Sequence, residues 1–166
     1  MANFNETMLT AFDLVMGQVA VDVSKKLITD KINFEIYSRL SYEQVLERIS
    51  LILETMIEAI ETNKPDPLIK LANQIIETRL RTGYDPNTLL KAINLIAEEF
   101  IVAAAATKPD EPYFAQAIRR RLSYIINSSK LHLANLNLTI PIAERNRIDP
   151  DLLKDSISQI TFRNRR

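Results

Sequence analysis

The side chains that most often carry chemistry in proteins are scarce in this sequence. His132 is the only histidine among 166 residues, and there is no cysteine. A histidine can be an axial ligand of haem iron, but His132 falls in the last long helical segment rather than in a central one. The adjacent pairs Glu98–Glu99 and Asp110–Glu111 point apart on a helix and do not form a metal-binding or catalytic pair. We therefore expect no catalytic residue, no metal site and no cofactor, and thus a protein that is not an enzyme.

Composition excludes further classes of site. The absence of cysteine excludes disulfides, zinc–thiolate sites and iron–sulfur clusters, and two glycines are too few for a phosphate-cradling loop. No basic residue precedes Lys25, so the N-terminus lacks the charged region of a secretory signal. Apolar stretches are far shorter than the roughly 20 residues of a membrane span. These features favour a cytoplasmic globular domain.

Charge is distributed unevenly along a chain whose net charge is zero. Residues 1–116 carry 11 basic and 17 acidic side chains, a net charge of −6, whereas residues 117–166 carry 10 basic and 4 acidic ones, a net charge of +6. Arg119, Arg120 and Arg121 form a possible basic interaction patch within the second part. Such a cluster can bind nucleic acid or an acidic partner. Because no exposed aromatic residues interleave with it, we favour a solvated helix face or a complement to the acidic half, and we consider nucleic acid unlikely.

The helical periodicity of apolar residues predicts the elements that must position these side chains. Apolar side chains recur every three or four residues, and no segment alternates as a strand does. Capping signals mark several boundaries, for example Ser41 with Gln44, and an aspartate–proline pair at Asp66, Asp85 and Asp149. Gly83 suits a helix end, and Gly17, inside the first helix, predicts close approach of another backbone. The expected helices cover residues 4–30, 41–62, 67–81, 86–107, 112–138 and 150–160, with a short helix or bend over 31–40.

The segment 86–107 is apolar on nearly every side, which predicts a central helix or a helix covered by a second chain. Leu131 adds an apolar side chain outside the main stripe of the 112–138 helix. Both features favour a homodimer, with a well-packed monomer as the alternative. If the long helices enclose a cavity, an apolar pocket for a fatty-acid-like or tetrapyrrole ligand is a second alternative. Its candidate lining residues are Met16, Met56, Phe100, Phe114 and Tyr124.

Three runs of residues carry a family resemblance. They are Tyr37–Glu43 (YSRLSYE), Asn63–Leu68 (NKPDPL) and Arg79–Ala92 (RLRTGYDPNTLLKA). Over about residues 5–138 the chain resembles the N-terminal domain of RsbR/RsbRD-type proteins, the RsbT co-antagonist sensors of the bacterial stressosome. The resemblance rests on caps, corners and core spacing. Members of that family usually continue into a STAS output domain, which this sequence lacks, so we expect either an excised fragment or a stand-alone version.

The resemblance implies a non-haem, globin-like sensory domain that is usually dimeric. With the residue patterns, it predicts an all-α, globin-like helical bundle of about six to seven helices and no sheet. Residues 1–140 are expected to form the sensory domain, and residues 141–166 a short helix and a basic tail. The predicted function is a sensory or regulatory input module of bacterial stress signalling. Its expected partners are a second copy of the chain and other regulatory proteins, with no membrane. The alternative is a small-ligand carrier with a globin-like pocket.

Overall fold

Six helices and no strand make up the part of the chain that the computed structural model describes, residues 3–79 and 86–139. The prediction of an all-α bundle without a sheet is thereby confirmed. The predicted helix over 150–160, the segment 141–166 and the boundaries at Gly83, Asp85 and Asp149 lie outside the described residues. In chain order the helices are α1 (Phe4–Thr29), α2 (Glu35–Ser38), α3 (Tyr42–Thr62), α4 (Asp66–Arg79), α5 (Pro86–Ala106) and α6 (Pro112–Thr139).

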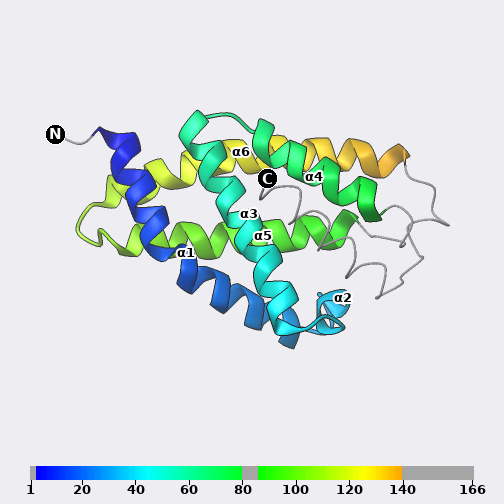
Figure 1. Ribbon diagram of the computed structural model, residues 1–166. Helices are drawn as coiled ribbons and strands as arrows, with labels where there is room; N and C mark the ends of the chain where they lie inside the picture. Colours follow the sequence, from blue (N-terminus) through cyan, green and yellow to red (C-terminus); the bar gives the residue numbers. More distant parts are fainter. Residues whose placement is uncertain (1–2, 80–85, 140–166) are drawn as a thin grey trace.

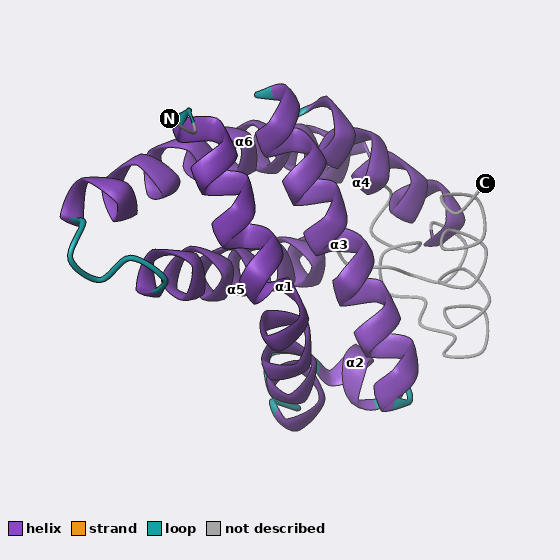
Figure 2. Cartoon of the chain, turned by 60° about the vertical axis from the view of Figure 1, so that its left-hand side comes forward, coloured by secondary structure: helices purple, strands orange, loops and turns teal. Residues whose placement is uncertain are grey.

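The helices form two layers that cross each other. The long helices α5 and α6 lie side by side, and α1 and α3 cross in front of them (Figure 1). Helix α4 follows α3 and returns to pack against α6, whereas the short α2 lies at the far end of α1 and α3 (Figure 2). Each long helix therefore contacts at least two others, and the apolar faces meet in one core.

Helix α5 is central to this core, as its apolar composition predicts. The Phe100 ring, fully buried, packs edge-on against the Phe12 ring of α1 with 4.3 Å between centroids. Most of the apolar surface of α5 is thus covered by α1 and α6 of the same chain. Val102 is an exception, with 59% of its surface exposed. The buried residues of α5 are Leu89, Ala92, Ile93, Ile96, Ala97, Phe100, Ile101 and Ala104.

Two helices, α1 and α3, begin with a reciprocal capping box, a local arrangement that defines the first residue of the helix. At α3, the Gln44 amide donates to Ser41 Oγ at 3.2 Å, and the Ser41 amide donates to the Gln44 side chain at 3.0 Å. At α1, Asn3 and Glu6 form the same arrangement, which the sequence analysis missed. These bonds satisfy amides that a helix N-terminus leaves free.

At α4 the expected N-cap residue, Asp66, is wrong by one position. The helix already begins at Asp66, and the Ile69 amide donates to the Pro65 carbonyl at 3.0 Å. Asp66 is therefore the first helical residue rather than the cap. Its carboxylate still lies at the positive end of the helix dipole, where an acidic side chain is favourable.

A polar turn after α1 starts the return of the chain towards α3. The Asn33 side-chain amide donates to Asp30 Oδ2 at 2.9 Å, and the Asn33 backbone amide donates to Asp30 Oδ1 at 3.1 Å. These two hydrogen bonds to the charged form lower the pKa of the Asp30 carboxyl below its usual value. The turn brings α2 and then α3 back against α1.

The environment of Gly17 contradicts the expected close approach of another backbone. A Cβ placed on Gly17 would meet nothing within 4 Å among the described neighbours, and the residue is exposed. Within a single chain, this glycine therefore has no packing role and only lowers the helix propensity of α1.

We expect Gly17→Ala to stabilise the protein by about 0.5–1 kcal/mol, because alanine loses less backbone entropy on folding and has room for its methyl group. Urea unfolding followed by circular dichroism measures the change. A destabilised variant would contradict this expectation and would place another chain against α1 at this position.

Candidate functional site

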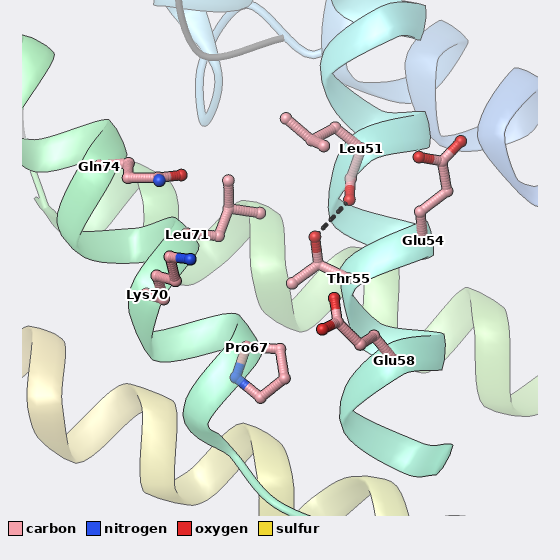
Figure 3. Close-up of a pocket in the computed structure, with 8 residues that line it drawn as sticks. All are labelled: Leu51, Glu54, Thr55, Glu58, Pro67, Lys70, Leu71 and Gln74. Atoms are coloured by element: carbon pink, nitrogen blue, oxygen red, sulfur yellow. Dashed lines mark hydrogen bonds between the residues drawn. The ribbon is translucent and has the colours of Figure 1, made fainter. Parts of the chain in front are cut away.

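A shallow hollow lies between α3 and α4 in the described part of the chain. Its volume is about 200 Å³. Glu54 and Glu58 stand one turn apart on α3, and Lys70 and Gln74 extend from α4 (Figure 3). The remaining lining residues are Leu51, Thr55, Pro67 and Leu71.

The hollow offers charged and polar side chains for recognition, namely Glu54, Glu58, Lys70 and Gln74. Thr55 Oγ1 donates to the Leu51 carbonyl at 2.8 Å, so its hydroxyl proton is engaged within α3. No histidine or cysteine lines the hollow, and no group of three metal-ligating side chains occurs in the described part of the chain. Because ligand pockets usually measure roughly 300–1,000 Å³, this hollow is too small for a tetrapyrrole or a fatty acid.

Four of the five residues proposed to line an apolar pocket, all but Tyr124, belong to the hydrophobic core or pack against it. Met56 and Phe100 are fully buried in the core, and Phe114 is buried with its ring 6.1 Å from that of Phe4. Tyr124 faces outwards with 55% of its surface exposed, and Met16 is only partly buried. None of the five lines the hollow between α3 and α4.

The three consecutive arginines of α6 point in different directions and have different partners. Arg119 Nη1 lies 3.1 Å from the Glu98 carboxylate of α5. Arg121 donates to the Asn5 side chain at 2.9 Å and to the Ile60 carbonyl at 3.4 Å, which ties α6 to the start of α1 and the end of α3. Arg120 is exposed. Two of the three arginines therefore connect α6 to neighbouring helices, and the three do not form a single surface patch.

His132 is partly buried and bridges two helices. Its Nε2 lies 2.6 Å from Asn73 Oδ1 of α4, within hydrogen-bond distance. The sequence analysis expected this histidine in the last long helical segment, and it lies on α6. One ring nitrogen of His132 is therefore occupied by a contact that joins α4 to α6.

Two features of the structure were missed in the sequence analysis. Arg48 of α3 is buried, with 3% of its surface exposed, and its guanidinium group stacks on the ring of Tyr37. The sequence spacing indicates this burial, because Arg48 lies one helical turn from both Val45 and Ile52, which are buried. The second feature is a pair of exposed tyrosines on the outer face of α6, Tyr113 and Tyr124, which are 82% and 55% exposed. They lie on the same helix as Arg119, Arg120 and Arg121, on either side of them in the sequence, so the expectation that no exposed aromatic residue interleaves with this cluster is wrong. Leu131, which was expected outside the main apolar stripe of this helix, is 65% exposed.

No protein-family profile matches the chain, and no curated protein or solved structure matches it either. Within the described ranges, no helix has both the length and the apolar character needed to cross a bilayer.

The adjacent arginines Arg120 and Arg121 give a matched pair of variants. We expect Arg121→Ala to lower the free energy of unfolding by about 1–2 kcal/mol, because it removes charged hydrogen bonds that join three helices. Arg120→Ala, at an exposed position, is expected to change it by less than about 0.5 kcal/mol. Urea unfolding at low protein concentration measures both. Equal effects of the two substitutions would contradict the role assigned to Arg121.

Proposed function

We propose that this chain is a regulatory input module of bacterial stress signalling that works in the cytoplasm, without haem, through dimerisation and contacts with other regulatory proteins. The family resemblance supplies the signalling role. The physical observation that carries the interaction role is the outer face of α6, where large apolar and aromatic side chains are exposed. Exposed apolar surface of this kind is typical of protein–protein contacts.

The exposed residues of α6 form a stripe that is self-complementary. Tyr113, Arg120, Tyr124 and Leu131 are separated by seven, four and seven residues, which places them on one side of the helix. Tyr113 and Leu131 lie equally far from Leu122 along the sequence, and so do Arg120 and Tyr124. The buried Leu122 faces the core, opposite to this stripe.

This symmetry supports an antiparallel pairing of two α6 helices about a two-fold axis level with Leu122. In that register Tyr113 packs on Leu131 of the second copy, and Arg120 lies over Tyr124 of the second copy. An arginine over an aromatic ring is a favourable cation–π pair. A two-fold contact uses the same patch on both subunits, as this stripe allows. Because one helix face is smaller than the standard interface of about 1,600 Å², we expect weak, micromolar self-association.

Leu131→Asp tests the proposed dimer. The substitution would bury an unpaired charge against Tyr113 of the second copy, so we expect it to shift the protein to a monomer in sedimentation velocity runs at tens of micromolar. Leu14→Asp is the matched control, because Leu14 is 75% exposed on α1 and lies outside the stripe. Wild-type protein that sediments as a monomer throughout this range would overturn the proposal.

Disulfide cross-linking tests the register. Because the sequence has no native cysteine, only the introduced cysteines can form disulfides. Ala117→Cys and Asn127→Cys lie five residues on either side of Leu122. We expect a mixture of the two variants to cross-link across the pair. Each variant alone should not, because its two copies would be about 15 Å apart along the helix axis. Cross-linking of each variant alone, to the same extent as the mixture, would rule out this register.

A further inference from the structure

Arg48 is a buried cation without a hydrogen-bond acceptor. Its side chain has 3% of its surface exposed, and Nε, Nη1 and Nη2 are all buried with no hydrogen-bond partner. Its charged group lies over the ring of Tyr37, with Cζ 5.1 Å from the ring centroid. Tyr37 is itself buried and packs edge-on against Phe34, with 6.0 Å between the ring centroids.

The stacking on Tyr37 satisfies only one face of the guanidinium group. A guanidinium group has five N–H donors in its plane and does not lose its proton in proteins, so burial cannot be relieved by neutralisation. A cation–π contact leaves those in-plane donors unpaired. Leaving them unpaired inside a protein is strongly unfavourable, and such a group calls for an acceptor.

The other arginines with described side-chain contacts behave differently from Arg48. Arg39 pairs with Glu35 at 2.6 Å, and Arg119 pairs with Glu98. Arg121 reaches a side-chain oxygen and a backbone carbonyl. These three are at least partly exposed, whereas Arg48 is almost completely buried. The most deeply buried arginine of the described chain is thus the one that lacks an acceptor.

We propose that Arg48 binds the carboxylate of a small organic monocarboxylic acid inside the bundle, at the junction of α2 and α3. The two carboxylate oxygens match the in-plane donors of the guanidinium fork, which forms paired, charge-assisted hydrogen bonds. Val45 and Ile52, one turn before and after Arg48 on α3, are apolar and buried in the core. The hydrocarbon part of the acid would pack against them once local opening of the bundle admits it.

The charge balance selects a monocarboxylate rather than a dianion. One carboxylate neutralises one guanidinium, so the occupied site carries no net charge. A phosphate or sulfate dianion would leave a buried negative charge, because Arg48 is the one charged residue among the buried residues that the structure describes. Buried charges are tolerated when they are paired. The ligand reaches the site through local opening of the bundle, a motion that folded proteins undergo routinely.

This site is spatially separate from the proposed dimer face, because it lies on α3 whereas the dimer face lies on α6, so the two proposals are tested separately. It gives the proposed input module a ligand to sense. Failure of the dimer experiment leaves the Arg48 site unaffected, and failure of the ligand experiment leaves the dimer unaffected.

Thermal unfolding with sodium butyrate tests the proposal. We expect butyrate to raise the melting temperature of the wild type by several degrees relative to sodium chloride at equal ionic strength, because a ligand that binds only the folded state stabilises it. Arg48→Met should abolish this rise. In chloride alone, Arg48→Met should melt above the wild type, because methionine fills similar space without a buried charge. Arg39→Met, at an exposed arginine, is the control and should keep the butyrate response.

Three outcomes would overturn the assignment. They are no response of the wild type to butyrate, an undiminished response of Arg48→Met, and an equal response of the wild type to phosphate or sulfate. If Arg48→Met does not fold, the wild type decides the question through nitrogen-15 NMR. The chemical shift of the Arg48 Nε–H resonance should then change on titration with butyrate and stay unchanged with chloride. A chemical shift that does not change with butyrate would refute the site.

Discussion

The contact between Phe12 and Phe100 joins the two layers of the bundle, and the rest of the structure depends on it. Both rings are fully buried, and they meet edge-on where α1 crosses α5. Aromatic rings prefer this geometry, and they bury more apolar surface than most other side chains. Because α1 also packs on α3, and α5 also packs on α6, this crossing holds both helix pairs together. The ion pair between Lys26 and Glu99 adds a second link between α1 and α5 at the surface.

Helix α6 adds polar links to that apolar framework. Arg119 reaches α5, Arg121 reaches the end of α3 and the start of α1, and His132 reaches α4. The side of α6 that carries its buried residues therefore packs against other helices of the same chain. The opposite side, with Tyr113, Tyr124 and Leu131, is what remains for contacts with another protein. The division of one helix into a core face, polar links and an exposed stripe follows directly from its 3.6-residue period.

The helix boundaries could be predicted because they depend on local interactions. Ser41 and Gln44 satisfy each other's amides within one turn, so the signal is complete in four residues of sequence. The surroundings of Gly17 could not be predicted, because a glycine in a helix looks the same whether another backbone lies above it or not. The partners of Arg121 are 61 and 116 residues away along the chain, which no local pattern reveals. Likewise, periodicity identified Phe100 and Met56 as inward-facing, but packing alone decides whether such residues line a cavity or fill a core.

At Arg48 the local pattern and the burial conflict, and this conflict is the basis of the proposed ligand site. Stacking on Tyr37 compensates only part of the cost of burying this guanidinium group, and we expect an apolar residue in its place to stabilise the fold. Consistency between sequence pattern and structure is otherwise high in α3, whose remaining buried residues are apolar apart from Thr55. In the last turn of the same helix, the Ile60 carbonyl accepts a hydrogen bond from Arg121 of α6, the neighbour of Arg120 in the exposed stripe. Helix α3 therefore joins the proposed ligand site at Arg48, in its first half, to the helix that carries the proposed dimer face. By thermodynamic linkage, any effect of the ligand on self-association must equal the effect of self-association on the affinity for the ligand. The arrangement of α3 thus provides a direct physical connection between the two proposed functions of the domain.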